Sequence, residues 1–250
     1  MDITEITAKN ALVRSRIPGV DYVINPYLGC GHGCRYCYAV FMRKYSHGHA
    51  DSAWGAFVEA KVNIVERLRK ELASKRTKGT ANLSSVCDPY QPVERRYKLT
   101  RGCVQALLEA GWGVDILTRS PLVLRDLDLL ASSRNVSVGL SVPTDDDRVR
   151  RILEPGSPPI GSRIVTLRTL HEAGIETYAF IGPMLPMNPR ALYEAVGPYV
   201  NSVLIDALNY RGQVAALFRR HGWTQELTDE YADETAAALR QLFGAKAERV

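Results

Sequence analysis

Residues 29–38 read Gly29-Cys-Gly-His-Gly-Cys-Arg-Tyr-Cys-Tyr38 and place Cys30, Cys34 and Cys37 in one short loop with the spacing C-x3-C-x2-C. Three thiolates at this spacing suit a single metal centre, and a cube of four irons has four corners that need ligands. One iron would therefore have no protein ligand. An open coordination position is typical of a catalytic metal site rather than a structural one. The glycines of the loop allow its backbone to approach a cluster closely.

The composition indicates one enzyme-sized domain. The chain has 250 residues, of which 46% are hydrophobic, and α/β barrels of about this length fold as one domain. We interpret residues 1–250 as a single domain, with an N-terminal extension over 1–20 and C-terminal helices over 207–250. We expect no signal peptide and no membrane span, because no apolar stretch is long enough. Five cysteines, three of them in one loop, argue against a secreted disulfide framework, so we expect a cytoplasmic protein.

Strand and helix patterns alternate along the chain, which predicts parallel βαβ units. The predicted strands are residues 22–25, 81–87, 113–118, 136–142, 175–181 and 203–206. The predicted helices are residues 54–74, 99–110, 121–130 and 163–173, with two more in 207–250. We therefore expect an α/β fold, an incomplete (β/α)6 barrel of the TIM type, because a closed barrel has eight units. Its chemistry should lie at the carboxyl ends of the strands, where the cysteine loop follows the first strand.

The sequence around the cysteines resembles a known family. Asn25-Pro-Tyr27-x-Gly29-Cys30 and Cys34-x-Tyr36-Cys37-Tyr38-Ala39 are similar to the cluster loop of radical S-adenosylmethionine (SAM) enzymes, most closely the spore photoproduct lyase-like branch. Three further stretches look like this branch: Cys87-Asp-Pro-Tyr-Gln-Pro-Val-Glu94, Arg151-Ile-Leu-Glu-Pro-Gly156 and Gly182-Pro-Met-Leu-Pro186. The resemblance implies a barrel of the radical SAM kind and extends over roughly residues 20 to 190, most of a barrel of this size.

The resemblance also implies the cofactors and their chemistry. Cys30, Cys34 and Cys37 match the ligands of a [4Fe-4S] cluster, whose open iron binds the methionine part of SAM in that family. An electron from the cluster cleaves SAM to a 5′-deoxyadenosyl radical, which abstracts hydrogen from the substrate. Tyr36 matches an aromatic residue that packs beside the adenine, for which an aromatic face is physically suited. Together with Tyr38 it also matches tyrosines implicated in relaying hydrogen, although Tyr38 is equally explained by core packing.

Four further residues are candidate SAM contacts through the same resemblance. Asp88 and Glu94 are the available acceptors for its ammonium group. Arg119 falls where the lyase has a lysine that meets the carboxylate, and arginine preserves that charge. Ser141, at the end of the fourth predicted strand, could reach the ribose or the methionine end.

One position departs from the lyase. The lyase has a cysteine that supplies a hydrogen atom where this chain has Ser85, and a serine O–H bond is too strong to donate readily to a carbon radical. Cys87 falls where the lyase has a serine that contacts SAM. Because Cys87 lies two residues beyond Ser85, both should lie on one face of the predicted strand, near the cofactor. Cys87 is either the replacement hydrogen donor or a small buried strand residue.

Three hypotheses for the function remain open. The first is a radical SAM enzyme whose substrate the sequence does not identify. The second is DNA photoproduct lyase activity, which needs a surface that grips DNA and a pocket for the damaged bases, whereas residues 207–250 read as two helices. The third is a non-catalytic metal-binding module, such as a zinc site of the three cysteines with His32, His47 or His49, although a second short knuckle is missing.

The charge permits an anionic partner without requiring one. The net charge is +5 and the isoelectric point near 9.0, but the basic clusters are scattered along the chain rather than gathered in one stripe. Arg95-Arg-Tyr-Lys98 is the exception, since it follows a loop expected at the rim of the active site. The family resemblance implies an electron donor of the flavodoxin or ferredoxin type. The basic rim would suit that acidic partner or a nucleic acid.

Overall fold

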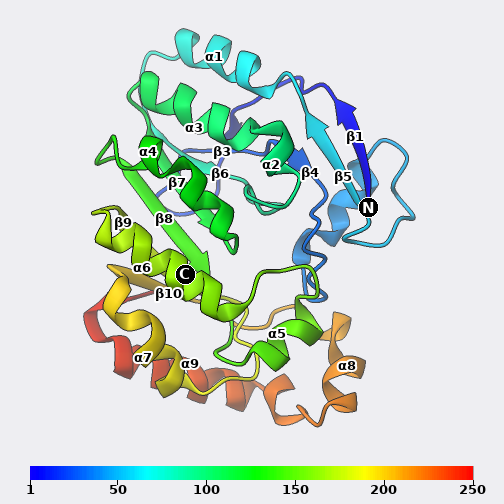
Figure 1. Cartoon of the computed structure of the whole chain (residues 1–250). Coiled ribbons are helices and arrows are strands. Elements are labelled where there is room, and N and C mark those ends of the chain that lie inside the picture. Colours follow the sequence, from blue (N-terminus) through cyan, green and yellow to red (C-terminus); the bar gives the residue numbers. More distant parts are fainter. Residues whose placement is uncertain (250) are drawn as a thin grey trace.

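The computed structural model describes residues 1–249 and shows an open sheet with helices packed around it (Figure 1). The strands of the main sheet are β2 Val13–Arg14, β3 Tyr22–Ile24, β6 Thr80–Leu83, β7 Gly113–Thr118, β8 Val136–Ser141, β9 Glu176–Ile181, β10 Ser202–Ile205 and β11 Ala247–Arg249. Their spatial order is β11-β10-β9-β8-β7-β6-β3-β2. All neighbours pair in parallel except β2 with β3. Within the described residues β2 and β11 do not pair, so the barrel is incomplete, as predicted.

The helices connect these strands and cover the outside of the sheet (Figure 1). The α-helices are α1 Ile64–Ser74, α2 Glu94–Tyr97, α3 Leu99–Glu109, α4 Leu127–Leu130, α5 Asp147–Leu153, α6 Ile160–Glu172, α7 Pro189–Val196, α8 Ala215–Arg220 and α9 Asp229–Phe243. Short 3-10 helices are η1 Tyr38–Tyr45, η2 Pro121–Asp126, η3 Gly197–Tyr199, η4 Arg211–Gln213, η5 Gln225–Leu227 and η6 Gly244–Lys246. No helix in residues 1–249 is both long and apolar enough to cross a membrane.

The hydrophobic pattern explains the elements that were predicted. In α1 the buried residues Ile64, Leu68 and Leu72 recur every four positions and form one apolar stripe. In β7 the degree of burial alternates along the strand: Val114 and Ile116 are buried, whereas the residues next to them are half-buried. The six strands predicted from such patterns are β3, β6, β7, β8, β9 and β10, and each lies beside the next one along the chain.

Three predicted elements differ from the structure. Residues 54–74 are not one helix, because Phe57–Lys61 form strand β5 and only the part after Asn63 is helical. Four of the five β5 residues are buried, including the charged Glu59, so a strand that is buried on both faces shows no apolar alternation with a period of two. Residues 121–130 form η2 followed by the single turn α4. The second predicted strand, 81–87, ends at Leu83.

A second, smaller sheet supports the cysteine loop and was not predicted. It has the order β1-β5-β4, with β1 at Asp2–Ile6 and β4 at Tyr27–Leu28. β1 belongs to the segment interpreted as an extension, and it pairs in parallel with β5. β4 pairs antiparallel with β5 and runs directly into Gly29 and Cys30. The position of the cysteine loop is therefore set by the small sheet as well as by the barrel.

Candidate active site

The three cysteines of the loop lie against one cavity. Cys30, Cys34 and Cys37 are free thiols, the first two buried and the third half-buried. The cavity lies at the carboxyl ends of the parallel strands, where the sequence analysis expected the chemistry. It is also lined by candidate residues from other parts of the chain, namely Tyr36, Tyr38, Ser85, Cys87, Asp88, Arg119 and Ser141. Among the candidate site residues, Glu94 alone does not line it.

Glycines allow two segments to pack closely on the cysteine loop. Gly29 has a φ of 85°, and a Cβ atom there would lie 2.5 Å from the carbonyl oxygen of Phe57 in β5. On the other side, the N–H of Gly156 donates to the carbonyl of His32 at 3.0 Å, and a Cβ atom at Gly156 would lie 2.6 Å from the carbonyl oxygen of Gly31. A larger residue fits at neither position. The loop is therefore held between β5 and the segment after α5.

Gln91 binds the loop on both sides of Cys30. Its fully buried side chain accepts from the N–H of Gly31 at 2.8 Å, and its Nε2 donates to the carbonyl of Gly29 at 3.1 Å. A glutamine amide carries both an acceptor and donors, so it can satisfy both backbone groups at once. No role was predicted for Gln91 from the sequence. The only hint of a role in the sequence was that Gln91 belongs to the Asp-Pro-Tyr-Gln-Pro stretch. Its hydrogen-bond partners could not be inferred, because they lie 60 and 62 residues away along the chain.

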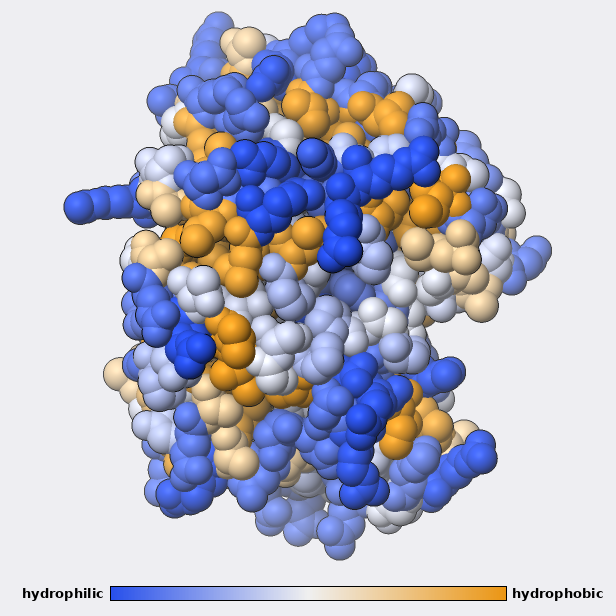
Figure 2. Space-filling view, in the orientation of Figure 1, coloured by the Kyte–Doolittle hydropathy of each residue, from blue (hydrophilic) through white to orange (hydrophobic). Residues whose placement is uncertain are grey.

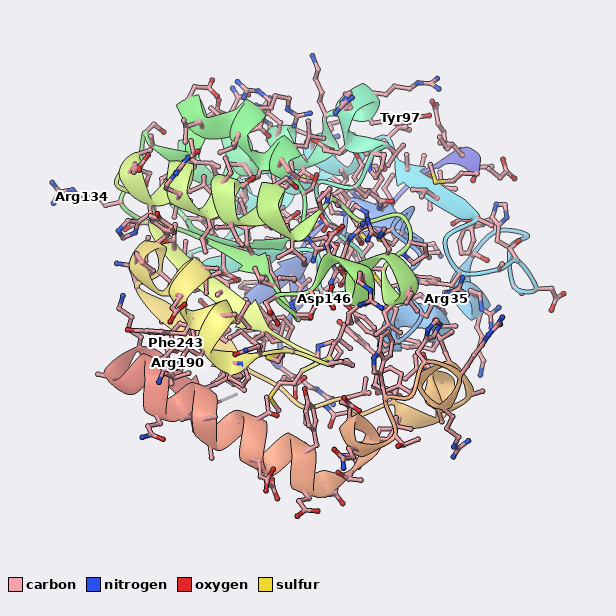
Figure 3. All side chains as sticks on the ribbon, turned by 60° about the horizontal axis from the view of Figure 1, so that its bottom comes forward. Arg35, Tyr97, Arg134, Asp146, Arg190 and Phe243 are labelled. Atoms are coloured by element: carbon pink, nitrogen blue, oxygen red, sulfur yellow. The ribbon has the colours of Figure 1, made fainter. Side chains whose placement is uncertain are left out.

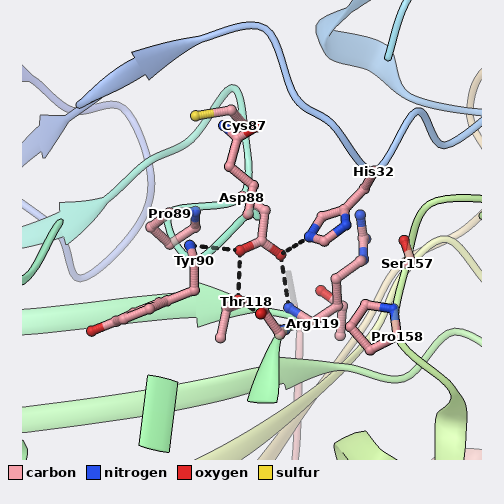
Figure 4. A network of polar contacts seen from close by, with 12 residues as sticks. His32, Cys87, Asp88, Pro89, Tyr90, Thr118, Arg119, Ser157 and Pro158 are labelled. Atoms are coloured by element: carbon pink, nitrogen blue, oxygen red, sulfur yellow. Dashed lines mark hydrogen bonds and ion pairs between the residues drawn. The ribbon is translucent and has the colours of Figure 1, made fainter. Parts of the chain in front are cut away.

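Asp88 connects the cysteine loop to the end of β7 (Figure 4). Its Oδ1 accepts from the N–H of Tyr90 at 2.8 Å and from the hydroxyl of Thr118. Its Oδ2 accepts from the N–H of Arg119 at 2.9 Å and lies 3.3 Å from Nε2 of His32. Burial opposes ionisation of Asp88, but the contacts with His32 and the charge of Arg119 outweigh burial and hold its pKa below the ordinary value. The carboxylate thus lines the cavity while its oxygens are bonded to protein donors.

Arg119 lies between the cysteine loop and a buried carboxylate. Its Nη1 donates to Sγ of Cys34 at 3.0 Å, and its Nε is 3.7 Å from Oε1 of Glu154. Burial alone would lower the pKa of Arg119, but the neighbouring Cys34 and Glu154 raise it well above its ordinary value. The side chain is 16% exposed and lines the cavity. It therefore presents a permanent positive charge beside a predicted cluster ligand.

Tyr36 is more deeply buried than a residue that only faces a cofactor. It is 6% exposed, its ring packs in a hydrophobic cluster with Leu153 and Phe218, and its hydroxyl donates to Glu154. Glu154 is fully buried and also pairs with the fully buried Arg163. Burial would raise the pKa of Glu154, but the charges of Arg119 and Arg163 hold it below the ordinary value. Glu154 and Arg163 were not predicted, although Glu154 belongs to the Ile-Leu-Glu-Pro-Gly stretch noted in the sequence.

Ser85 and Cys87 lie in a turn rather than on a strand, because β6 ends at Leu83. The expectation that a spacing of two residues puts both side chains on one strand face is therefore wrong. The N–H of Ser85 donates to Oδ1 of Asn25 at 3.1 Å, and its carbonyl accepts from the hydroxyl of Tyr38. Both Ser85 and Cys87 still line the cavity, and the turn is hydrogen-bonded to the side chain of Asn25, the residue after β3.

The thiol of Cys87 lies in the cavity and in contact with a serine hydroxyl. Its Sγ is 2.8 Å from Oγ of Ser84, a residue with a positive φ of 74°, and 3.6 Å from the carbonyl of Tyr27. Burial raises the pKa of Cys87 to about 12, even though the contact with Ser84 lowers it. The thiol is therefore protonated at neutral pH.

Glu94 does not face the cavity, contrary to the expectation that it accepts from SAM. It is fully buried at the start of α2 and accepts from the hydroxyl of Tyr27, the N–H of Thr100 at 2.9 Å and Nη2 of Arg125 at 2.7 Å. The reason is the turn at Gln91 and Pro92, which directs the chain away from the strand ends and starts a helix. The basic residues 95–98 that follow form α2 and its end, and they do not line the cavity.

Ser141 and the segment after β10 complete the cavity. Ser141 ends β8 and is buried, and its carbonyl accepts from Nη1 of Arg163 at 2.9 Å. Residues 206–210 also line the cavity, which was not predicted from the sequence. Asp206 accepts from Nδ2 of Asn209 at 3.2 Å, and the ring of Tyr210 stacks on Tyr38 with 6.5 Å between centroids. The sequence feature that could have indicated this lining is Asp206, the polar residue at the end of the sixth predicted strand.

The histidines considered as zinc ligands have other partners. Nδ1 of His32 lies 3.0 Å from the carbonyl of Gly156, Nδ1 of His47 lies 3.1 Å from Oε2 of Glu59, and His49 stacks on Phe57. None of the three lines the cavity of the cysteines. In the part of the chain that the structure describes, no group of three His, Cys, Asp or Glu side chains is arranged to hold a single metal ion.

The sequences of several relatives align with most of the chain. An uncharacterized protein of Methanocaldococcus jannaschii is 37% identical over 214 residues, which are 84% of this chain and 79% of that protein. An uncharacterized protein of Mycobacterium tuberculosis is 32% identical over 191 residues, which are 73% of this chain and 56% of that protein. A protein of Pseudomonas phage M6 named Radical SAM Nalpha-GlyT isomerase is 26% identical over 231 residues, which are 87% of this chain and 47% of that protein.

Solved structures share the fold. Spore photoproduct lyase complexed with dinucleoside spore photoproduct superposes with a TM-score of 0.70 at 14% identity, covering 99% of this chain and 81% of the lyase. Streptococcus suis SuiB bound to S-adenosylmethionine superposes with a TM-score of 0.56 at 15% identity, covering 91% of this chain and 49% of SuiB. At the level of sequence, the family model described as the Radical SAM superfamily matches residues 24–196, and the chain therefore belongs to the radical SAM superfamily.

Proposed function

We propose that this radical SAM enzyme holds a [4Fe-4S] cluster on Cys30, Cys34 and Cys37 and cleaves SAM in the adjoining cavity. The observation that carries the proposal is the convergence of three free thiols and the partly buried guanidinium of Arg119 on a single cavity at the carboxyl ends of the strands. When bound, the cluster and SAM supply an electron and a 5′-deoxyadenosyl radical that abstracts hydrogen from the substrate. Soft thiolates are the donors that iron–sulfur clusters use.

The residues around the cysteines suit SAM as well. Arg119 offers a planar guanidinium to the methionine carboxylate, which it can bind with two parallel hydrogen bonds. Asp88 fixes the backbone of Arg119 and thereby its side-chain position. Tyr36, Tyr38, Ser85 and Ser141 line the same cavity and would contact the remaining parts of SAM.

We further propose that Cys87 supplies a hydrogen atom in the later part of the reaction. The thiol lines the cavity, and a pKa raised to about 12 by burial keeps the S–H bond present at neutral pH. An S–H bond is weak enough to give its hydrogen to a carbon radical, unlike the O–H bond of Ser85. The contact with Ser84 Oγ orients the thiol.

Anaerobic reconstitution tests the proposal. The protein should bind four irons and show the broad visible absorption of a cluster, and reduction with dithionite in the presence of SAM should yield 5′-deoxyadenosine even without substrate. Cys103 provides a matched control, because it is a fully buried free cysteine of the core that does not line the cavity. Cys103→Ala should therefore keep the cluster. Stoichiometric zinc without an iron-dependent visible band would refute the proposal.

Repair of a DNA photoproduct is a second candidate, supported by one observation. Tyr38 and Tyr210 stack at the mouth of the cavity and are 47% and 53% exposed. Exposed aromatic faces are suited to stacking against bases that have left the helix. Turnover of a dinucleoside photoproduct and a salt-dependent affinity for DNA would support this candidate. Failure of both while SAM is cleaved would leave the general radical SAM activity alone.

A further inference from the structure

A second hollow lies on the outer side of the cysteine loop. It is formed by Gly33, Cys34 and Arg35 of the loop, by Trp54, and by Leu217 and Arg220 of α8, and we refer to it as the outer basin. In Figure 3 Arg35 lies near α8, and in Figure 2 the surface is hollowed at the right between α8 and the upper part of the molecule.

Cys34 separates the outer basin from the active-site cavity. Cys34 lines both hollows, and so does Trp54. Its side chain is buried, and on the cavity side its Sγ accepts from Arg119 at 3.0 Å. A molecule seated in the outer basin would therefore lie one residue away from the predicted cluster, without entering the cavity that receives SAM and substrate.

The outer basin is positively charged with an apolar floor. Arg35 and Arg220 are exposed on it, and within residues 1–249 neither forms an ion pair. Arg219, the next residue on α8, is also exposed. No carboxylate belongs to the lining, and Leu217 and Trp54 supply apolar surface between the two arginines. Such a combination of an apolar centre and uncompensated rim charge fits a transient contact with an acidic protein.

We propose that the outer basin docks an acidic electron-carrier protein that reduces the cluster. This inference rests on the proposed function, which consumes one electron for each SAM cleaved. The carrier, a low-potential flavin or iron–sulfur protein, is oxidised by one electron. That electron passes through the cluster to the sulfonium of SAM, whose C5′–S bond breaks to give methionine and the 5′-deoxyadenosyl radical, and no proton is transferred in the step. Because Cys34 separates the two hollows, the carrier and SAM bind at the same time.

Binding of a bacterial flavodoxin to the reconstituted protein tests the docking directly. Arg220→Glu and Arg35→Glu should each weaken the affinity about tenfold at low salt, because each change places a negative charge opposite acidic residues of the carrier. The loss should shrink at high ionic strength, where exposed charges are screened. Arg134→Glu is the matched control, since Arg134 is exposed and projects from the opposite side of the molecule in Figure 3. This variant should bind flavodoxin like the unmodified protein.

The outcomes separate this inference from the proposed function. Dithionite-driven formation of 5′-deoxyadenosine is measured in the same preparations and does not depend on the carrier. If it is absent while Arg220→Glu weakens flavodoxin binding, the proposed function is wrong and the docking surface stands. If Arg220→Glu and Arg35→Glu bind flavodoxin as tightly as Arg134→Glu does, the docking proposal is wrong. It is also wrong if these variants lose affinity only for a single-stranded DNA oligonucleotide.

Discussion

The two sides of the active-site cavity differ in how their polar groups are bonded. On the side of the cysteine loop, Asp88, Glu154 and Arg163 are buried and bonded to other protein groups. On the side formed by η1 and the segment after β10, Tyr38 and Tyr210 are about half exposed and stack on each other, and the hydroxyl of Tyr38 donates to the carbonyl of Ser85. A buried charge cannot move without losing its partner, whereas an exposed ring can. If the proposed function holds, the buried side would be preorganised for a cofactor of constant shape, and the exposed side would be free to adapt to a substrate.

The largest effect should come from the cysteines on the buried side. Replacing Cys30, Cys34 or Cys37 by Ala should abolish cluster retention, because two thiolates leave the cube under-ligated. Iron and sulfide content after anaerobic reconstitution measures this. A Cys34→Ala variant that retains four irons would show that the loop is not the cluster site.

Breaking the buried ion pair should destabilise the fold. Glu154→Gln leaves Arg163 charged and unpaired in the interior, which should lower the free energy of unfolding by about 3–5 kcal/mol. The double variant Glu154→Gln/Arg163→Met is the control and should recover part of the loss. Because the pKa of Glu154 is held below its ordinary value, its stabilising effect is present at neutral pH and lost on acidification. The difference between wild type and Glu154→Gln in urea unfolding should therefore narrow below about pH 4.3, the ordinary pKa of glutamate.

Arg119→Ala should weaken SAM binding by about 1.5–3 kcal/mol, or roughly 10- to 150-fold, because a charge-assisted contact to the carboxylate is lost. The contact between Arg119 and Cys34 predicts a change in the cluster spectrum as well. Arg119→Lys should restore part of the affinity. Anaerobic titration of the spectrum with SAM gives both quantities, and an unchanged dissociation constant in Arg119→Ala would contradict the assignment.

The smallest effect on the fold should come from the exposed side. Tyr210→Ala should change the free energy of unfolding by no more than about 0.5 kcal/mol, as surface substitutions usually do. Iron content and substrate-independent formation of 5′-deoxyadenosine should stay unaltered. Loss of the cluster in Tyr210→Ala would show that the exposed side also supports the cofactor, and the contrast between the two sides would disappear.

The sequence by itself determined the order of the barrel strands and predicted the cysteine loop as the site of the cluster. Both depend on local patterns: the C-x3-C-x2-C spacing lies within eight residues, and each core strand is a short apolar run followed by a helical stripe. Parallel strands in one sheet align their carboxyl ends, so the polar residues that end β7 and β8 were expected at the cavity without knowledge of their contacts. Local patterns failed at β5, where burial on both faces removed the alternation of a strand.

Only the tertiary structure decided which polar residues face the cavity and which hold its sides in place. Glu94 and Asp88 stand six residues apart in one motif, yet Glu94 is bonded to buried partners at the start of α2 whereas Asp88 lines the cavity. Gln91 meets the cysteine loop across about 60 residues of chain, and Tyr36 meets Glu154 across 118. Such contacts carry no periodic signal, since they arise when packing brings distant buried polar groups together and each group needs a partner. The physical reason for the difference is the range of the interaction: spacing along the chain encodes the elements, whereas hydrogen bonding in the interior depends on how the elements pack.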